Sequence, residues 1–314
     1  MRPPAPENPH HPVELLHRPG ALLRVRPKTA GGQARLCNMV YAEALGTGLI
    51  MDVLRPASGG NGLGVVDVVS SGWHSDRVVM NEHLGFGLAD ALCARGFTVF
   101  AVSPGSSALF TGADMVLHVH AALRHIKQHS AHYGVEPARL GVTGASAGGH
   151  LAALAALSPQ KGRPDSRDGW RRQDASVRAA ALFFPPTDLI DFGGVRFDSL
   201  RLEGVDPGAL LFRGGTVGRN DGEITDRLRE LSPVYRAAHF AAAHHGAAPP
   251  PFLLVHGTAD PLVPVAQTHR LADALRRAGG LAEVILREGG GHPWPDNEKE
   301  LAAAAEWLFA RLAD

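Results

Sequence analysis

The chain has 314 residues, which is long enough for one large α/β domain or two smaller domains with a substantial core. Its 31 lysines and arginines balance its 31 aspartates and glutamates, so the sequence carries no basic stripe that would recruit nucleic acid or an anionic membrane surface. Two cysteines in a chain of this size exclude a disulfide framework. These properties favour a globular protein whose partner is a small neutral molecule.

The first 35 residues are rich in proline, which removes backbone donors and interrupts both helical and strand periodicity. We therefore expect residues 1–35 to form an irregular arm and residues 36–314 to form the folded domain. The arm has no apolar stretch of signal-peptide length, and no later segment reaches the roughly 18 apolar residues of a transmembrane helix. The expected location is the cytoplasm, with no membrane partner.

Short apolar runs alternate with helical patterns along the rest of the chain. Residues 36–44 and 47–56, joined through Gly46, predict a β-hairpin. Further strands are expected in GVVDVVS, FTVFAVSP, RLGVTG, AAALFFP, PFLLVHG and AEVILRE, and helices at about residues 80–95, 113–133, 147–157, 265–279 and 296–312. This alternation predicts an α/β fold with a mostly parallel sheet covered by helices on both faces.

Two polar stretches interrupt the alternation. Residues 158–178 are rich in turn-forming residues, and we expect them to form a surface excursion. Residues at about 186–235 fit no regular core element well, and insertions of this length in an α/β domain often form lids or pocket walls. A lid-like insertion is therefore expected there.

The strongest chemical signal is the segment RLGVTGASAGGHLAALAAL, in which a strand pattern ends at Gly144 and a helical pattern begins at Ala147. Ser146 stands between them in a G-x-S-x-G motif, in the strand-turn-helix setting that this motif requires. A serine there sits on a sharp turn, where side chains at Gly144 or Gly148 would collide with neighbouring backbone. The motif predicts that Ser146 is a nucleophile.

A serine hydroxyl needs a histidine to take its proton and a carboxylate to orient that histidine. Asp260 follows the strand pattern PFLLVHG, and His292 follows the strand pattern AEVILRE. Both therefore lie at carboxyl ends of strands, on the same edge of the sheet as Ser146. Asp188, in the segment PPTD, is a second candidate for the carboxylate, since either choice preserves the order Ser, Asp, His. We favour Asp260 because its turn follows the stronger strand.

With these motifs, the chain resembles the α/β-hydrolase fold and, within it, esterase/lipase-like and prolyl-oligopeptidase-like hydrolases such as carboxylesterases and feruloyl-type esterases. The resemblance covers about residues 36–312 and rests on GASAGGHLAA, HGTADPLVP and GGGHPWP. It implies that Ser146 is the nucleophile, Asp260 the acid and His292 the general base of a catalytic domain.

The family's strand before its first long helix ends in His-Gly-Gly-Gly-Trp, where this sequence has Val69-Ser70-Ser71-Gly72-Trp73. The resemblance implies that this loop and the residue after the nucleophile donate backbone N–H groups to the oxyanion. We assign these donors to Ala147 and to Gly72 and Trp73. Serines at 70 and 71 replace glycines that relatives carry. Their hydroxyls either donate to the oxyanion or serve only as local caps or turn residues.

His74 follows this loop and suggests a rival Ser-His site, but adjacent residues on an extended segment point to opposite sides. Four histidines of the helix expected at 113–133, His118, His125, His129 and His132, share one face. We interpret them as a solvated stripe rather than as metal ligands. Neither a metal nor another cofactor is expected.

Trp73 and Trp294 lie beside the oxyanion segment and the base, and we expect them to contact substrate. The resemblance implies hydrolysis of small carboxylic esters of short acyl or aromatic acids, including esters attached to carbohydrate. The alternatives are a serine peptidase of prolyl-oligopeptidase type and a hydrolase fold that binds a ligand without catalysis. The sequence does not specify an oligomeric state.

Overall fold

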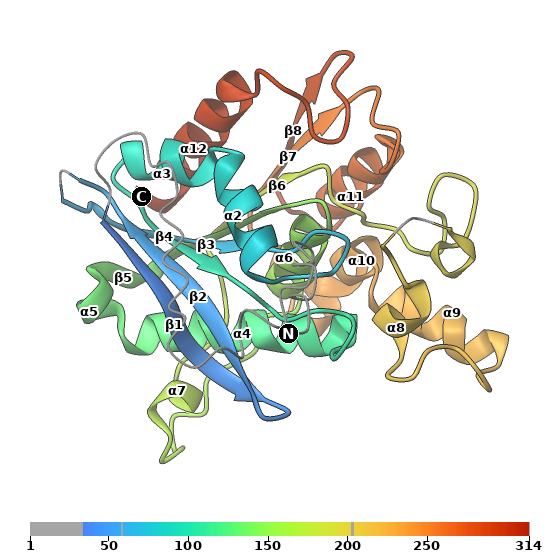
Figure 1. The fold of residues 1–314 in the computed structure, drawn as a ribbon, viewed down its shortest axis with the longest axis horizontal. Coiled ribbons are helices and arrows are strands. Elements are labelled where there is room, and N and C mark those ends of the chain that lie inside the picture. Colours follow the sequence, from blue (N-terminus) through green and yellow to red (C-terminus); the bar gives the residue numbers. More distant parts are fainter. Residues whose placement is uncertain (1–33, 58, 202–203, 314) are drawn as a thin grey trace, which may run out of the picture.

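A computed structural model describes residues 34–57, 59–201 and 204–313. The arm expected at residues 1–35 therefore lies almost wholly outside the described residues. Eight strands form one sheet through the centre of the molecule, as Figure 1 shows. They are β1 (Ala34–Ala44), β2 (Thr47–Arg55), β3 (Gly62–Val68), β4 (Thr98–Val102), β5 (Val135–Ala145), β6 (Ala179–Phe183), β7 (Phe252–Gly257) and β8 (Ala282–Arg287).

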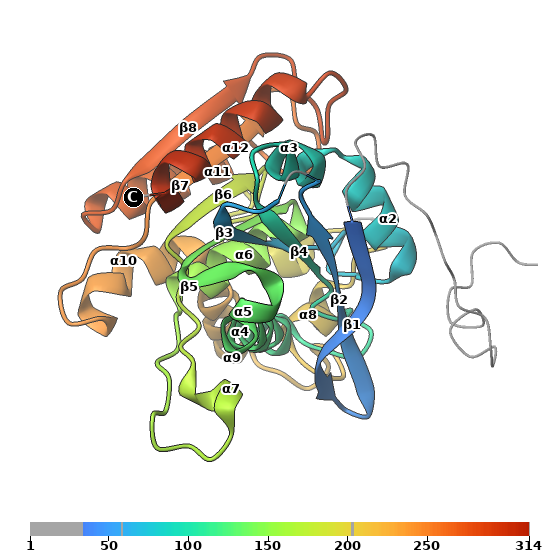
Figure 2. The same cartoon turned by 90° about the vertical axis from the view of Figure 1, so that its left-hand side faces the viewer.

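The strand order across the sheet is β1-β2-β4-β3-β5-β6-β7-β8. Strand β2 pairs antiparallel with both β1 and β4, and every later pair in this order is parallel. Figure 2 shows the sheet from β1 on the right to β8 on the left. The hairpin turns at Leu45 and Gly46, which both have positive φ, as a two-residue turn between twisted strands requires. The predicted hairpin and mostly parallel sheet are confirmed.

Helices cover both faces of the sheet and bury a separate apolar cluster on each face. One face carries α2 (Arg77–Gly85), α3 (Leu88–Ala94) and α12 (Glu298–Ala313), and the other carries α4 (Gly112–Gln128), α6 (Ala147–Leu157), α10 (Pro233–Ala243) and α11 (Ala266–Arg277). Because β3, β5, β7 and β8 run in the same direction, the loops that follow them lie at one edge of the sheet. Those loops carry the predicted site residues.

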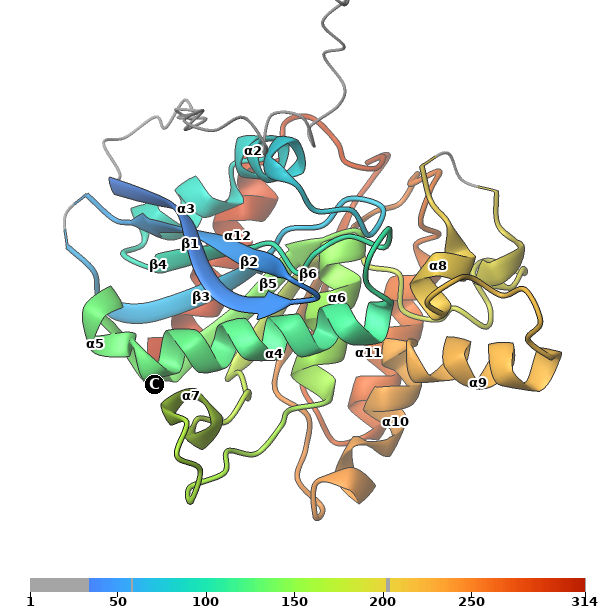
Figure 3. The same cartoon turned by 60° about the horizontal axis from the view of Figure 1, so that its bottom comes forward.

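Two predicted helices are interrupted in the structure. The pattern at 80–95 breaks at Gly87, whose φ of 93° is outside the helical region, and so becomes α2 and α3. The pattern at 113–133 ends at Gln128 and continues as the short α5 (Ser130–Tyr133). The excursion at 158–178 holds only α7 (Gly169–Arg172) among its described elements, and Figure 3 shows this loop projecting from the body.

The segment at about 186–235 is more regular and more deeply packed than its sequence indicates. It contains the 3-10 turn η1 (Phe197–Ser199), α8 (Pro207–Leu211), α9 (Asp221–Glu230) and the start of α10. Leu189, Phe197, Leu210 and Leu228 are fully buried in the core cluster that lies under α4 and α6. The expectation that this stretch fits no regular core element was wrong. It arose because the apolar residues of the stretch are too widely spaced to show a single period.

Candidate active site

Ser146 lies at the tip of the turn between β5 and α6, with φ 52° and ψ −123°. This conformation is rare for a residue with a side chain, and close backbone contacts hold it. A Cβ added to Gly148 would stand 2.1 Å from the Val68 carbonyl oxygen, and one added to Gly144 would stand 2.6 Å from the Gly148 carbonyl. Only glycine fits at either position, so the local sequence forces the sharp turn that exposes Ser146.

Two loops bring an imidazole and a carboxylate to this serine. The His292 Nε2 lies 2.9 Å from the Ser146 Oγ, and the His292 Nδ1 lies 2.7 Å from the Asp260 Oδ2. His292 comes from the loop after β8 and Asp260 from the loop after β7. The three side chains that the sequence proposes as a triad are therefore joined by a continuous chain of hydrogen bonds.

Asp260 is held in place by its own turn. Its Oδ1 accepts the N–H groups of Leu262 at 2.8 Å and Val263 at 2.9 Å, and its Oδ2 also lies 3.3 Å from the His256 Nε2. Burial alone would raise the pKa of Asp260, but the hydrogen bonds from His256, His292 and Val263 together lower it well below its usual range. The carboxylate stays ionised and keeps the proton of His292 on Nδ1, which leaves Nε2 free to accept.

Asp188, the competing carboxylate, lies in a different network. Its Oδ2 accepts from Arg270 at 2.9 Å, and its Oδ1 accepts the N–H groups of Ile190 and Asp191. Arg270 also pairs with Asp191. The geometry thus gives Asp188 a turn and anchoring role at the start of the 186–235 segment and leaves Asp260 as the partner of His292.

A cavity of about 360 Å³ opens beside Ser146 and His292. Its walls come from α2, from the loop after β3 and from the residues around the serine and the histidine. They comprise Ser70, Ser71, Val79, Glu82, His83, Gly85, Phe86, Ala145, Ser146, Phe184, His292 and Pro293. The exposed lining is largely apolar, which suits a small uncharged acyl group.

Neither tryptophan that we expected to contact substrate lines this cavity. Trp73 is 3% exposed, its ring packs edge-on against Phe197, and its indole N–H donates to the His150 Nδ1 at 3.0 Å. Trp294 is 4% exposed and lies behind Phe184, with ring centroids 5.6 Å apart. Both substrate-contact predictions are corrected, because each ring packs in the core and does not line the cavity.

The loop after β3 forms a tight turn in which Ser71 and His74 exchange both backbone hydrogen bonds, at 2.9 and 2.8 Å. Gly72 and Trp73 are its central residues, with φ 53° and 60°. A Cβ added to Gly72 would meet Val205, and the Trp73 ring packs against Phe197. The loop residues that line the cavity are Ser70 and Ser71. The assignment of the Gly72 and Trp73 N–H groups as oxyanion donors stays a prediction.

Ala147 is better placed as a donor. It is the first residue of α6, so the helix itself offers its N–H no acceptor. The positive end of the helix dipole lies at the same point. The role of the Ala147 N–H as one oxyanion donor stays a prediction.

Sequence reasoning missed Phe184 and His83. The Phe184 ring packs edge-on against the His292 imidazole at 4.5 Å, and it carries a strained φ of 39°. The His83 Nε2 lies 2.8 Å from the buried Asp67 Oδ1. Burial opposes the charged imidazole, but the neighbouring Asp67 carboxylate raises the pKa of His83. The only sequence signal was an aspartate inside an apolar strand pattern, which demands a partner.

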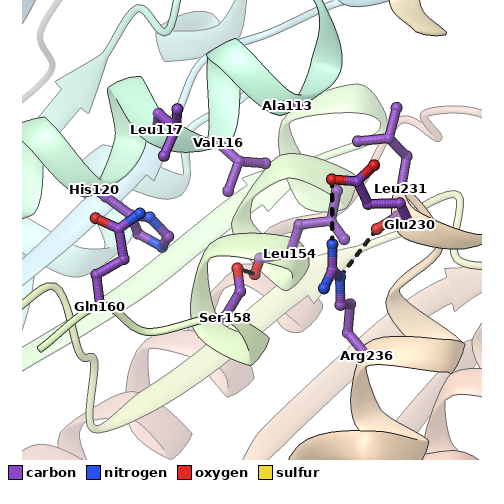
Figure 4. Close-up of a pocket in the computed structure, with 10 residues that line it drawn as sticks. All are labelled: Ala113, Val116, Leu117, His120, Leu154, Ser158, Gln160, Glu230, Leu231 and Arg236. Atoms are coloured by element: carbon purple, nitrogen blue, oxygen red, sulfur yellow. Dashed lines mark hydrogen bonds and ion pairs between the residues drawn. The ribbon is translucent and has the colours of Figure 1, made fainter. Parts of the chain in front are cut away.

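A second cavity, of about 210 Å³, lies between α4, the end of α6 and the start of α10. Figure 4 shows its lining, which includes His120 and the Arg236 side chain beside Glu230. None of Ser146, Asp260 and His292 lines it. The candidate active site is therefore the cavity at the strand ends. Within the described residues, no helix has the length and apolar character to cross a membrane.

A sheet of this order, with a strand-turn-helix elbow after β5 and an Asp and a His on later loops, defines an α/β-hydrolase fold, as predicted. The chain belongs to the BD-FAE family, which matches residues 51–275. The resemblance stated from the motifs is thereby confirmed at the level of fold and family.

Individual proteins agree with this assignment. The probable carboxylic ester hydrolase LipM of Mycobacterium tuberculosis is 33% identical over 192 residues, which is 60% of this chain and 40% of LipM. The chain spans about two fifths of the length of the first curated relatives it matches. The fold is shared with a truncated carbohydrate esterase from gut microbiota (TM-score 0.71, 21% identity, 92% and 99% of the two chains). It is also shared with the thermophilic esterase Est2 of Thermogutta terrifontis (TM-score 0.64, 25% identity, 93% and 97%).

Proposed function

We propose that this protein hydrolyses small carboxylic esters through an acyl-enzyme on Ser146. The observation that carries the proposal is the hydrogen-bonded chain from Ser146 through His292 to Asp260, at the mouth of a cavity of about 360 Å³. The match to a carboxylic ester hydrolase supports it. A strained nucleophile, an oriented base and an ionised acid are the groups that acyl transfer requires.

In the proposed reaction, the His292 Nε2 takes the proton of Ser146 as its Oγ attacks the ester carbonyl. The Ala147 N–H and a donor of the loop after β3 stabilise the oxyanion. His292 then gives the proton to the leaving alcohol, and water repeats the sequence on the acyl-enzyme. Asp260 orients His292 and stabilises its cationic form throughout.

The cavity walls favour a compact acyl group. Val79, Phe86 and Phe184 form apolar surfaces around Ser146, and the cavity volume is sufficient for a short acyl chain or one aromatic ring. We therefore propose esters of short acyl or aromatic acids, including esters attached to carbohydrate. Whether residues at about 186–235 act as a lid stays a prediction.

The decisive experiment compares ester and peptide surrogates on the same protein. Wild-type protein is expected to turn over p-nitrophenyl esters of short and aromatic acids and to form a Ser146 adduct with a fluorophosphonate. Ser146→Ala should abolish both. Preferential turnover of aminoacyl-p-nitroanilides would instead identify a peptidase, and a wild-type protein with neither turnover nor adduct would identify a binding protein.

The assignment of the acid is tested by a matched pair of variants. Asp260→Ala should lower kcat by about 10⁴-fold, because His292 loses the group that fixes its tautomer. Asp188→Ala should retain activity per folded molecule, since Asp188 contacts Arg270 and not His292. A larger loss in Asp188→Ala would exchange the two roles.

The pH profile tests the base. Asp260, whose pKa is lowered, stays ionised through the neutral range, so the acid is not lost there, while the first step requires a neutral imidazole as base. Esterase activity should therefore fall as the pH is lowered from about 8 to about 5. A flat profile over that interval would contradict the role of His292.

A further inference from the structure

Ser70 carries a hydroxyl group that the folded protein does not satisfy. The residue is 3% exposed, and its Oγ is buried without a hydrogen-bond partner among the described residues. A buried hydroxyl without a partner costs free energy, and such groups in a native structure call for an explanation. An alanine here would avoid that cost, so the hydroxyl has no evident structural reason to be present.

The position of Ser70 connects it to the nucleophile. It lines the same cavity as Ser146 and His292. Its carbonyl oxygen accepts the N–H of Gly148 at 3.2 Å, which ties residue 70 to the first turn of α6. Residue 70 therefore packs against the first turn of α6, which carries the Ala147 N–H, and it shares the cavity wall with Ser146.

In the loop after β3, the turn itself uses the backbone N–H of Ser71. The Ser71 N–H is bonded to the His74 carbonyl, and neither Gly72 nor Trp73 lines the cavity. Ser70 does line the cavity, and its hydroxyl is a donor that no other described residue uses. It can rotate toward charge as it develops, and in the free protein it competes for no other acceptor.

We propose that the Ser70 Oγ–H donates a hydrogen bond to the oxyanion of the tetrahedral intermediate on Ser146, beside the Ala147 N–H. This inference rests on the proposed ester hydrolysis. Ser70 donates a hydrogen bond and transfers no proton, so the proton passes only between Ser146, His292 and the leaving alcohol. In this proposal the Ser70 hydroxyl gains an acceptor only while the carbonyl oxygen of the ester is negatively charged. Because it contacts that reacting oxygen, Ser70 is a catalytic residue.

The test replaces Ser70 by alanine and measures kinetics and thermal stability together. Ser70→Ala should lower kcat by roughly 10- to 10³-fold with little change in KM. The rate of inactivation by a fluorophosphonate, whose adduct carries a tetrahedral oxyanion-like oxygen, should fall in parallel. The melting temperature should stay the same or rise, because the variant loses only an unsatisfied group. A structural hydroxyl would give the opposite shift in melting temperature.

Two further variants complete the test. Ser176→Ala is the matched control, because Ser176 is exposed in the 158–178 excursion and does not line the cavity, and its kcat should stay within about twofold of wild type. Ser70→Cys keeps the side-chain size but offers a weaker donor, so its kcat should fall between those of wild type and Ser70→Ala.

An unchanged kcat in Ser70→Ala, a rise in KM alone, or a lower melting temperature would each overturn the inference. The two proposals fail separately. A wild-type protein without ester turnover or a Ser146 adduct contradicts the hydrolase. An active wild type with an equally active Ser70→Ala contradicts only the role of Ser70.

Discussion

Backbone contact at single residues decides the shape of the elbow. Gly148 presses on the Val68 carbonyl so closely that the first atom of any side chain would overlap it. The reactive conformation of Ser146 is therefore possible only because residue 148 is glycine and has no side chain.

Gly148→Ala tests this contact. The variant should lose about 1–3 kcal/mol of unfolding free energy, because the strand or helix must move to admit the methyl group. Its kcat should fall on the order of 10²-fold, because Ser146 moves relative to His292. Urea unfolding and ester kinetics measure the two effects. Gly60→Ala is the control, since its nearest neighbour stands 3.8 Å away, and a similar loss there would argue against a local cause.

His150 is a positioning residue for the loop after β3. Its Nδ1 accepts the Trp73 indole N–H, so its Nε2 carries the proton and donates to the Leu231 carbonyl at 2.7 Å. Complete burial lowers the pKa of His150 to about 4, so the ring is neutral. Trp73 adopts a positive φ that a bulky residue rarely tolerates, and this hydrogen bond helps to hold it there.

His150→Phe should leave the Trp73 N–H and the Leu231 carbonyl unpaired and so cost about 2–5 kcal/mol of unfolding free energy. Because Trp73 and Ser70 belong to one loop, kcat should fall more than KM rises. The exposed His239 on α10 gives the control His239→Phe. If His150→Phe lost stability with an unchanged kcat, His150 would be a core residue without influence on the site.

At the scale of elements, the segment at about 186–235 supports the site from behind. Its η1 turn places Phe197, which is fully buried, edge-on against Trp73 at 5.1 Å and against Phe192 at 5.7 Å. The would-be Cβ of Gly72 lies 3.3 Å from Val205 of the same segment. The segment thus buttresses the turn that follows β3.

Phe197→Ala should lower the unfolding free energy by about 3–5 kcal/mol, because a large fully buried ring is removed. It should also lower kcat, since Trp73 loses its packing partner. Val217, 94% exposed in the same segment, provides the control Val217→Ala, which should change neither quantity measurably. Equal effects of the two variants in denaturant unfolding would show that the segment packs too loosely to support the loop.

For the whole molecule, buried neutral histidines set the acid limit of stability. Burial lowers the pKa of His150 and of His125 to about 4, and it also lowers the pKa values of His118 and His120. The unfolded chain binds protons at these groups nearer pH 6.5, so the stability that they contribute is full above that pH. It is lost as the pH falls toward 4. His83 acts in the opposite sense, because Asp67 raises its pKa.

The unfolding free energy, measured with urea, should therefore decrease as the pH is lowered from about 7 to 5. His125→Gln removes one of these groups and should make the decrease shallower. A wild-type free energy that stays constant over this interval would contradict lowered pKa values for these histidines, because it would mean that the folded and unfolded proteins bind equal numbers of protons. Two of these rings also correct part of the predicted solvated stripe, since His118 and His125 are half-buried and hydrogen-bonded, while His129 and His132 are exposed as predicted.

Local patterns in the sequence were sufficient for the fold class, the strand positions and the three residues of the hydrogen-bonded chain. Strand periodicity and glycine spacing are local properties, and parallel strands bring their carboxyl ends to one edge whatever the loops contain. Ser146, Asp260 and His292 could therefore be selected without coordinates, and the geometry favours Asp260 over Asp188.

Only the tertiary structure decided what surrounds them. Trp73 and Trp294 became core rings, and Phe184 and His83 reached the cavity. Each outcome depends on which segment, far away in the sequence, packs next to the residue. Local sequence patterns do not specify such contacts. The sequence by itself determined which groups can react, while packing between segments determined which groups face the cavity, including the unpartnered hydroxyl of Ser70.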